Sequence, residues 1–514
     1  MSNVSGAPVH IVWFKRDLRV SDHEPLARAA LLGPVLPLYV LEPELWKQPD
    51  ASGRHYDFLM ECLSTLDRDL TKLGQPLLLE IGEMPHVLEA LRKRFAIAGL
   101  WSHQETGNGW TYERDKAVGR WCRQHQIPWR EYQGSGVIRA LSGRSGWSAR
   151  WQKFMAKPRF PRPKSLAQVE HFPKALVPSK SELGLLPDLC PGRQPGGRDQ
   201  AISDLRSFLK ERGRNYRFEM SSPRTADKAC SRLSTHLAFG TLSMREVLHS
   251  TAHRQDEILK HPHFPDGSIW NKSLLSFTSR LHWHCHFIQK LESEPEIEFQ
   301  NFHKAYDGLR PDGILPGSAE YKKFQAWATG QTGFPFVDAC MRSLISTGWI
   351  NFRMRAMLVA FATYHLWLPW REVGLHLAKL FTDYEPGIHW SQVQMQSGTT
   401  GINTIRIYNP VKQGHDQDPD GDFVRRWVPE LLDYPDVATH EPWKLASPGS
   451  IYPLRIVDHE IAAREAREKI WNVRKSKDHR AEAEAVLEQH GSRKAGRGKS
   501  KKAPAKDPQL KFEV

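Results

Sequence analysis

The first 135 residues alternate between short apolar runs and longer amphipathic stretches. The apolar runs are continuous and rich in β-branched residues, which is typical of strands buried on both faces. The stretches between them repeat apolar residues at helical spacing. We expect strands at 9–14, 34–41, 76–81, 99–103 and 127–132, a helix that begins near 22, and further helices at 54–73, 84–95 and 111–125. This alternation predicts a parallel sheet covered by helices, which is an α/β Rossmann-like domain.

The remainder of the chain shows two other patterns. Residues 136–200 are dominated by Gly, Pro, Ser and Arg, which predicts a connector that runs over the surface. Helical periodicity prevails over residues 201–488, where few segments resemble strands. We expect helices there at 201–212, 244–251, 273–291, 336–347, 353–368 and 370–381. The predicted organisation is an α/β domain (1–135), a connector and a large all-α domain.

The chain has 514 residues and a net charge of +14, and much of this excess lies at its end. Seven basic residues and no acidic one fall between residues 491 and 506, among Gly, Ala and Ser. This composition predicts a basic, disordered tail over 489–514. The tail is either a solubilising end or a non-specific clamp on nucleic-acid phosphates. Charge alone does not choose between DNA, RNA and a nucleotide as the anionic partner.

Several classes of protein are excluded at this stage. A membrane-spanning helix needs about 18 consecutive apolar residues, and every candidate run is interrupted by charges or prolines. The first residues are small and polar, unlike a signal peptide. The six cysteines are scattered without a CxxC pair, so we expect free thiols in a reducing cytoplasm. A cytoplasmic protein without a membrane partner is predicted, with a monomer as the default.

The end of the first predicted strand carries charged residues that need an explanation. Asp17 lies there between Arg16 and Arg19. These residues either hold an anion or lock the strand end through ion pairs, and we favour the lock. No G-x-G-x-x-G follows the strand, so the dinucleotide-binding fingerprint is absent at this place. A ligand of this domain is expected in the crevice at the carboxyl ends of the strands.

Three further sets of residues are candidates for chemistry. The segment Cys230–Ser231–Arg232–Leu233–Ser234 opens an apolar helix and either binds phosphate or simply caps the helix. His282 and His286 share a helical face, but no third ligand has zinc spacing, so a polar cavity wall is favoured and no metal site is predicted. The indoles of Trp327, Trp349, Trp370 and Trp390 either fill the core or relay single electrons to a buried redox group.

Several segments, taken together and in order, resemble the photolyase/cryptochrome family. They are WFKRDLRVSDHEPL, SRLSTHLAFGTLS, TGFPFVDACMRSLISTGW with the following NFRMR, RIYNPVKQG and DPDGDFVRRWVPEL. The resemblance extends from about His10 to Trp443. It implies that the helical domain binds FAD, and it agrees with the two-domain architecture predicted above.

The resemblance also implies roles for individual residues. Trp283 matches a tryptophan that contacts damaged DNA, and Arg353 lies on the DNA-facing rim. Trp283, Arg280, Trp370, Trp390 and His389 are the candidates for the catalytic set. The implied FAD-binding residues are Tyr216, Cys230, Ser231, Arg232, Leu233, Ser234, Phe277, Arg280, His284, Phe287, Arg355, Asp383, Tyr384 and Glu385.

Some positions depart from the pattern of photolyases that repair cyclobutane dimers. The family's cavity Glu is replaced by Arg280, the following Arg-Glu pair by His284–Cys285, an Asn by Phe352 and a Met by Ala356. The loop after Asp383 also differs, which leaves His389 as the candidate neighbour of the flavin ring. Trp370 fits the middle of the family's electron relay, whereas Trp390 falls two or three residues from the expected position.

Three functional hypotheses follow. The first is an FAD-dependent DNA photolyase, a carbon–carbon lyase that splits a pyrimidine dimer in damaged DNA with blue light. The alternative is a cryptochrome-like photoreceptor without repair activity. A flavoprotein that binds nucleic acid without photochemistry is the third. Glu113 matches a folate-contacting residue, so the N-terminal domain is expected to hold a folate antenna, a deazaflavin antenna or none.

Overall fold

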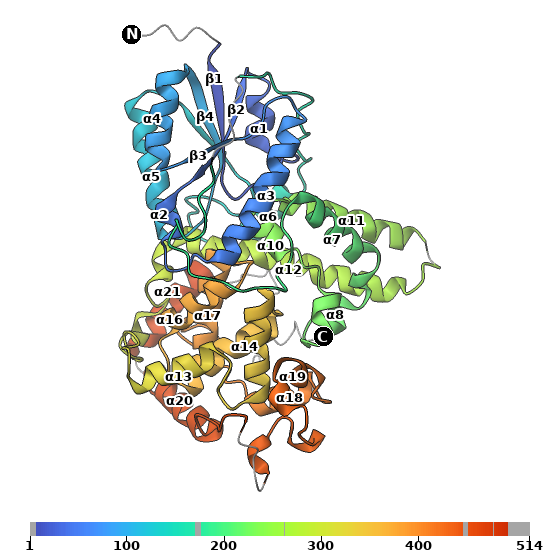
Figure 1. Cartoon of the computed structure of the whole chain (residues 1–514), viewed down its shortest axis with the longest axis vertical. Coiled ribbons are helices and arrows are strands. Elements are labelled where there is room, and N and C mark those ends of the chain that lie inside the picture. Colours follow the sequence, from blue (N-terminus) through green and yellow to red (C-terminus); the bar gives the residue numbers. More distant parts are fainter. Residues whose placement is uncertain (1–6, 170–175, 262, 446–450, 476, 492–514) are drawn as a thin grey trace.

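The computed structural model describes residues 7–169, 176–261, 263–445, 451–475 and 477–491. Two parts lie one above the other along the longest axis of the molecule (Figure 1). The upper part contains the sheet and the helices that flank it, and the lower part is largely helical. This is the predicted fold class, an N-terminal α/β domain followed by a large helical domain. The limits of the domains remain predictions.

The sheet has five parallel strands in the order β3-β2-β1-β4-β5. Its strands are β1 (Val9–Phe14), β2 (Val35–Leu41), β3 (Leu78–Ile81), β4 (Ile97–His103) and β5 (Trp129–Tyr132). Side chains of a strand alternate between faces, so Val12 and Phe14 of β1 join one apolar cluster while Ile11 and Trp13 join another. The central strands are thus buried on both faces, as their continuous apolar sequences predict.

Helices cover both faces of this sheet. They are α1 (Glu24–Ala29), the short α2 (Pro43–Trp46), α3 (Gly53–Thr71), α4 (Met84–Arg94) and α5 (Gly109–Gln124). Phe58 and Leu63 of α3 pack with Phe14, whereas Leu88 of α4 and Val118 of α5 pack with Trp13 on the other face.

The predicted connector contains one helix that the sequence analysis did not predict, α6 (Trp147–Met155). Trp147, Trp151, Phe154 and Met155 are all buried, at the spacing of one helical face. The surrounding Gly and Pro residues masked this signal. Trp151 lies edge-on to His282, with ring centroids 4.8 Å apart, so α6 packs on the helical domain.

The helical domain is built around the long helix α12 (Gly267–Ser293). A Cβ added at Gly387 would lie only 2.6 Å from the Cα of Ile288, so this glycine allows α12 and α17 (Pro386–Ser397) to approach closely. The other α-helices are α7 (Arg198–Lys210), α8 (Tyr216–Glu219), α9 (Ala226–Ala229), α10 (Ser234–Ala238), α11 (Met244–Lys260), α13 (Ala319–Ala328), α14 (Pro335–Thr347), α15 (Phe352–Ala360), α16 (Trp370–Leu380), α18 (Pro410–Gln417), α19 (Asp422–Trp427), α20 (His459–Arg474) and α21 (Lys477–His490).

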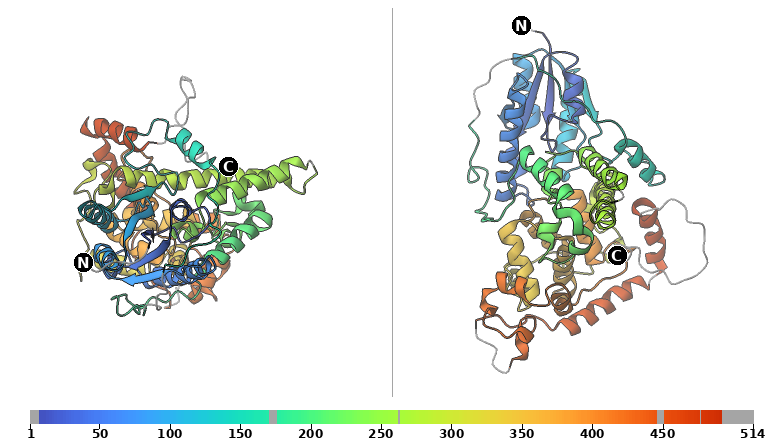
Figure 2. Two further views of the ribbon diagram at one scale, coloured as in Figure 1. Left: turned by 90° about the horizontal axis from the view of Figure 1, so that it is seen from above. Right: turned by 90° about the vertical axis from the view of Figure 1, so that its right-hand side faces the viewer.

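The described residues also form seven short turns of 3-10 or π-helix. One is a π-helical turn at Phe361–His365. The others are 3-10 turns at Arg212–Asn215, Pro295–Glu298, Lys304–Tyr306, Pro429–Leu431, Asp436–Ala438 and Pro442–Lys444. Figure 2 shows that α11 and α12 run together and project from the body of the molecule.

One predicted helix is shorter in the structure. The expected helix at 353–368 ends as α15 at Ala360 and continues only as the π-helical turn. Trp367 has a left-handed φ of +55°, and Leu368 precedes Pro369, which disfavours the helical conformation there. At the other end of the chain, helix α21 extends to His490 and so includes the first residues of the predicted tail. The rest of the predicted tail, from 492 on, lies outside the described residues.

Among the described residues, no helix is both long and apolar enough to cross a membrane.

The contact between Phe58 and the helical domain gives a first test of the fold. Phe58 is fully buried, and its ring lies 4.9 Å from that of Phe239 in the helical domain. Phe58→Ala should reduce the free energy of unfolding by about 3–5 kcal/mol, because it leaves a cavity in a closely packed core. Leu32→Ala, at a side chain that is 61% exposed, should change it by less than about 0.5 kcal/mol. Equal urea midpoints for the two variants would contradict this packing.

Candidate functional site

A cavity of about 410 Å³ lies within the helical domain. Its volume is in the range of small-molecule and cofactor sites. Residues from seven separate segments line it, on α8, the 230–234 segment, α12, α15 and the residues just before it, the 381–385 loop, α17 and the 406–408 segment. No single segment of the sequence therefore defines this site.

Most of the predicted cofactor residues meet at this cavity. Those that line it are Tyr216, Cys230, Ser231, Arg232, Ser234, Arg280, Trp283, His284, Phe287, Arg353, Arg355, Asp383, Tyr384, Glu385 and His389. Four of the predicted site residues do not line it. Leu233 is buried in the core, and Phe277 packs behind the wall against Tyr216. Trp370 of α16 and Trp390 of α17 pack against each other in an apolar cluster of the core.

The sequence analysis missed several residues of the cavity wall. Asn351, Gln392, Gln396, Arg406 and Tyr408 all line it. The two glutamines were detectable in principle, because they lie four residues apart on the otherwise apolar face of α17 that also carries His389. Arg406 and Tyr408 lie beyond that helix, in a segment without regular secondary structure, where periodicity gives no signal.

A bidentate ion pair between Arg355 and Asp383 lies in the wall of the cavity. Nη1 of Arg355 donates to Oδ1 of Asp383 at 3.0 Å, and Nη2 donates to Oδ2 at 2.9 Å. Burial alone would raise the pKa of Asp383, but Arg355 and the hydroxyl of Ser234 hold it below its ordinary value. The carboxylate is therefore ionised at neutral pH, and the bidentate geometry fixes the 381–385 loop against α15.

The 230–234 segment contributes a second cation to the cavity. The guanidinium of Arg232 lies over the ring of Trp349 at 4.0 Å, and Arg232 has a left-handed φ of +61°. Nη1 and Nη2 of Arg212 donate to the carbonyls of Lys228 (3.0 Å) and Ser231 (3.3 Å) and so hold the segment in place. Helix α10 has only five residues, so the Arg232 charge and not a helix dipole is the feature suited to a phosphate.

Two buried polar atoms of the cavity wall lack a partner among the described residues. They are Nδ1 of His284 and Oδ1 of Asn351. An unsatisfied buried group costs about 1–3 kcal/mol, so a polar ligand is expected to bind them. Burial and the charge of Arg16 lower the pKa of His284 to about 4, which leaves this imidazole neutral. Aromatic walls, polar edges and the Arg232 cation together fit a ligand that carries flat rings and phosphates, and FAD is such a ligand.

The rim of the cavity is cationic and aromatic. Trp283 stacks on Phe287 with ring centroids 5.5 Å apart. The guanidinium of Arg280 lies 4.8 Å from the ring centre of Phe352, a side chain that is 47% exposed. Arg353 also lines the cavity. Aromatic faces beside guanidinium groups are the features that unpaired bases and phosphates recognise.

Two of the four candidate relay indoles lie in contact. The rings of Trp370 and Trp390 are 5.9 Å apart, and Trp390 lies 5.0 Å from His389 at the cavity wall. Trp390 is fully buried, whereas Trp370 donates its indole N–H to Asn301 at 2.8 Å. The other two indoles are separate, since Trp349 lines the cavity and Trp327 packs against His376.

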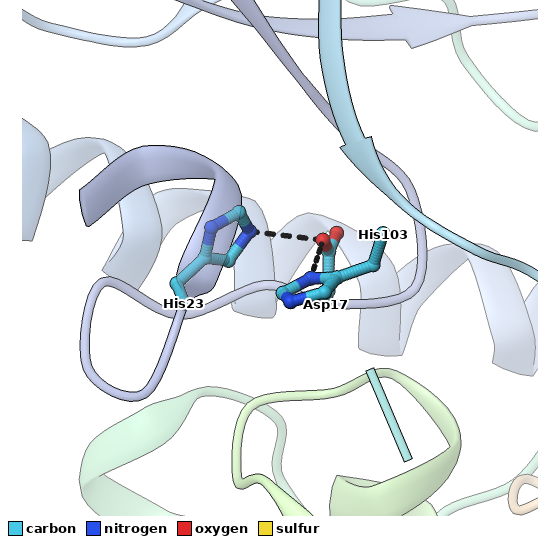
Figure 3. Close-up of side chains that lie close together, drawn as sticks. All are labelled: Asp17, His23 and His103. Atoms are coloured by element: carbon cyan, nitrogen blue, oxygen red, sulfur yellow. Dashed lines mark hydrogen bonds and ion pairs between the residues drawn. The ribbon is translucent and has the colours of Figure 1, made fainter. Parts of the chain in front are cut away.

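The histidines at 282 and 286 bind different protein partners. His282 pairs with the hydroxyl of Ser148 at 3.1 Å, and His286 pairs with Arg144. In the described part of the chain, the groups with metal-ligand spacing are Asp17, His23 and His103. Figure 3 shows the imidazole rings of His23 and His103 directed at the Asp17 carboxylate.

The protonation of His23 argues against a metal between these three residues. Nδ1 of His23 accepts the backbone N–H of Leu26, so its single proton must reside on Nε2. Nε2 then donates to Oδ2 of Asp17 at 2.9 Å and has no lone pair for a metal. Nδ1 of His103 bonds the same oxygen at 2.7 Å. The cluster is a hydrogen-bonded lock, which confirms the structural interpretation of Asp17, although its partners are histidines and not arginines.

A smaller crevice of about 120 Å³ lies at the carboxyl ends of β1 and β4, between the two domains. Lys15, Arg16, Asp17 and His103 line it from the α/β side, and His284 and Glu385 line it from the helical side. This is where a ligand of the α/β domain is expected. Glu113, however, pairs with Lys116 on an exposed face of α5 and does not line this crevice.

Comparisons with known proteins agree with this geometry. The profile described as the FAD binding domain of DNA photolyase matches residues 277–472, and the profile described as DNA photolyase matches residues 10–145. Deoxyribodipyrimidine photo-lyase of Vibrio cholerae is 28% identical over 475 residues, which is 88% of this chain and 97% of the relative. Cryptochrome DASH of Gloeobacter violaceus is 28% identical over 505 residues, which is 91% of this chain and 97% of the relative.

A solved structure gives the same result. The crystal structure of a bacterial class III photolyase from Agrobacterium tumefaciens is similar to this chain with a TM-score of 0.77 and 28% identity. The match covers 93% of this chain and 100% of that structure. The chain therefore belongs to the photolyase/cryptochrome family, and it has an FAD-binding domain of that family. Its relatives include both deoxyribodipyrimidine photo-lyases and a cryptochrome DASH.

The Asp17 lock predicts a specific pH dependence of stability. Burial lowers the pKa of His103 from 6.5 to about 3, so the unfolded chain binds a proton there below about pH 6.5 while the folded chain does not. As the pH is lowered below 6.5, the free energy of unfolding should therefore decrease, by up to about 1.4 kcal/mol per pH unit from this residue. His103→Asn retains a donor for Asp17 but does not titrate. Urea unfolding at pH 7, 6 and 5 should give a steeper loss for the wild type, and parallel losses would contradict the assignment.

Proposed function

We propose that this protein is an FAD-dependent DNA photolyase, a carbon–carbon lyase of the deoxyribodipyrimidine photo-lyase type. The observation that carries this proposal is an open cavity with Trp283 and Arg280 at its rim and the Arg355–Asp383 pair in its wall. A flavin site that opens to the surface through aromatic and cationic side chains suits a substrate that is a nucleobase attached to phosphates. The similarity to photo-lyases over 88% of the chain supports the same activity.

The proposed chemistry divides between the cofactor and the protein. Reduced FAD, when bound and excited by blue light, supplies an electron that opens the cyclobutane ring of a pyrimidine dimer and accepts it back afterwards. The contribution of the protein is to bind, orient and exclude water. Arg232 and Ser231 would hold the phosphates of the cofactor. Arg355 and Asp383 would hold the flavin ring at a fixed depth in the cavity.

The substrate would be a damaged dinucleotide flipped out of DNA. Flipping costs a few kcal/mol, and less at a damaged base, which favours the lesion over intact DNA. Trp283 would stack on the flipped bases, while Arg280 and Arg353 would bind flanking phosphates. Arg280 would supply positive charge beside these phosphates.

Two features of the wall would support redox chemistry. Trp390 and Trp370 form a path of indoles in contact from the neighbourhood of His389 toward Asn301. The ring of His389 donates from Nε2 to the carbonyl of Gly374 at 2.8 Å, and burial lowers its pKa to about 4. His389 would therefore be neutral, with its Nδ1 available as an acceptor beside the flavin.

We also propose that the interdomain crevice holds a light-harvesting antenna, a folate or a deazaflavin. Four basic and four acidic side chains line the crevice, so an antenna would bind there through hydrogen-bond donors and acceptors and not through net charge. The six cysteines are free thiols, which suits the cytoplasmic location that we propose.

A cryptochrome-like photoreceptor is the second candidate function. It is favoured by the contact of Arg280 with Phe352, because two large side chains at the rim narrow the entrance to a bulky lesion. The relationship to cryptochrome DASH is as close as that to the photo-lyases.

A light-dependent repair assay distinguishes the two functions. Oligonucleotides that carry a cyclobutane dimer or a (6-4) product should be restored by the reduced protein in blue light and not in the dark. Trp283→Ala should weaken lesion binding by about 1–3 kcal/mol, because one stacked base loses its aromatic partner. Trp471→Ala, at a tryptophan on α20 that is 56% exposed, is the matched control and should repair normally. Failure to restore either lesion, with FAD bound, would refute the photolyase and favour the photoreceptor.

The basic tail predicts how DNA binding depends on salt. Residues 492–514 lie outside the described structure, but their sequence contains all seven basic residues identified above. If they contact phosphates, replacing these seven residues by Ser should reduce the slope of log affinity against log salt by up to about 6. The measurement is a salt titration of binding to undamaged duplex DNA. An unchanged slope would assign the tail to solubility alone.

A further inference from the structure

The 381–385 loop, which carries Asp383, and the last residue of α16 before it are held by the α/β domain as well as by the helical domain. Four side chains of the α/β domain bind these residues. Nη1 of Arg54 donates to the carbonyl of Leu380 (2.8 Å), and Nε2 of His55 donates to that of Phe381 (2.8 Å). Nη2 of Arg16 donates to the carbonyl of Tyr384 (2.7 Å), and the hydroxyl of Tyr384 donates to Asp50 (2.8 Å).

Among these four, Arg16 has an additional connection. Its Nε donates to the carbonyl of Ala238 at 2.8 Å, and Ala238 lies at the end of the helix that follows the 230–234 segment. Nη2 of Arg16 is also 3.4 Å from Oε2 of Glu385. One guanidinium therefore links the end of strand β1 to the helix that follows the Arg232 segment and to the loop that carries Asp383.

The backbone around Arg16 is packed too closely to move independently of the helical domain. Gly240 has a left-handed φ of +67°, and a Cβ at this position would lie 2.2 Å from the carbonyl oxygen of Arg16. The backbone N–H of Leu18 donates to the carbonyl of Phe239 at 3.2 Å. Backbone contacts thus fix the position of Arg16 relative to the cavity, so its side chain is already oriented toward the carbonyl groups that it bonds.

The charge of Arg16 reaches both side chains that the crevice and the cavity share. Glu385 and His284 line both spaces. Burial raises the pKa of Glu385, and Arg16 opposes this effect. Arg16 also contributes, after burial, to the lowered pKa of His284. Removing the guanidinium would therefore remove the cation paired with Glu385 and would raise the pKa of this carboxyl further.

We propose that Arg16 is a positioning residue of the flavin site, supplied by the α/β domain, which holds Glu385 and the 381–385 loop in their binding geometry. This inference rests on the proposed binding of FAD in the cavity. The α/β domain then contributes to the FAD site in addition to the proposed antenna site. Arg16 would not touch the reacting atoms and would act through Glu385, Tyr384 and Ala238.

Affinity for FAD tests this role. FAD would be removed and titrated back into the full-length apoprotein, with binding followed by flavin fluorescence and by visible circular dichroism. Arg16→Gln should weaken FAD binding by about tenfold or more, because hydrogen bonds from a charged donor are lost, and should change the circular dichroism of the bound flavin. Arg16→Lys retains the charge but not the planar fork, and should give an intermediate affinity.

Arg19→Gln is the matched control. Arg19 lines the same crevice and donates across the interface to the carbonyl of Gly240 at 3.0 Å, but its other bond is to Asp22 and not to the loop. The Arg19→Gln substitution should lower the unfolding temperature while leaving FAD affinity within about twofold of the wild type. Equal losses of affinity in the Arg16 and Arg19 variants would show a general interface effect and overturn the proposal.

A second variant separates the remaining outcomes. Glu385→Gln removes the ion pair and leaves the bonds from Arg16 to the two carbonyls. It should weaken FAD binding in the same direction as Arg16→Gln, and it serves if Arg16→Gln does not fold. Unchanged affinity in both variants would refute the positioning role. A wild-type protein that takes up no FAD would instead refute the proposed function, so the two failures are distinguishable.

Discussion

A carboxylate that is removed from water remains ionised only if cations and donors surround it, and Asp383 imposes this constraint on the helical domain. Arg355 satisfies it through two hydrogen bonds, and the hydroxyl of Ser234 adds a third. These contacts join α15, the 381–385 loop and the 230–234 segment, which are separated by up to about 150 positions in the chain. The cavity exists because these three segments are held together around one charge.

The same principle recurs at the end of strand β1. Asp17 is buried, and its carboxylate is surrounded by the N–H groups of His23, His103 and the backbone of Lys15. This lock fixes the turn that carries Arg16, whose guanidinium reaches the loop of the cavity. The two buried carboxylates are thus connected through one arginine and one loop. The charged motif at the end of the first strand therefore bonds both the turn after β1 and the loop that carries Asp383.

The sequence predicted the elements better than their contacts. Strand β1 has the predicted bounds, because an uninterrupted apolar run of β-branched and aromatic residues has few alternatives. Helix α6 was missed because the surrounding Gly and Pro residues suggested a loop, and α15 was extended too far because Trp367 and Leu368 continue the apolar pattern past the helix end. Among the site residues, resemblance to the family and not periodicity brought Tyr216, Arg232 and Asp383 together.

The contacts that could not be predicted are those between distant segments. Arg16 and Tyr384 are 368 positions apart, and neither residue type signals the other. Asn351 carries no periodic signal that distinguishes a cavity wall from a satisfied polar core. Leu233 and Phe277 were assigned to the cofactor with their neighbours, but their side chains lie in the apolar core behind the cavity wall. Burial, and not position in a motif, decides which members of a segment face the ligand.

The central claim is that the cavity around the Arg355–Asp383 pair binds FAD. The most direct measurement is the flavin released from the purified protein by denaturation, identified by mass and quantified against the protein. The wild type should release FAD in equimolar amount, and Asp383→Asn should release much less, because a neutral amide cannot hold the guanidinium of Arg355 in the same bidentate geometry. Release of no flavin from the wild type, together with failure to take up added FAD, would contradict the account.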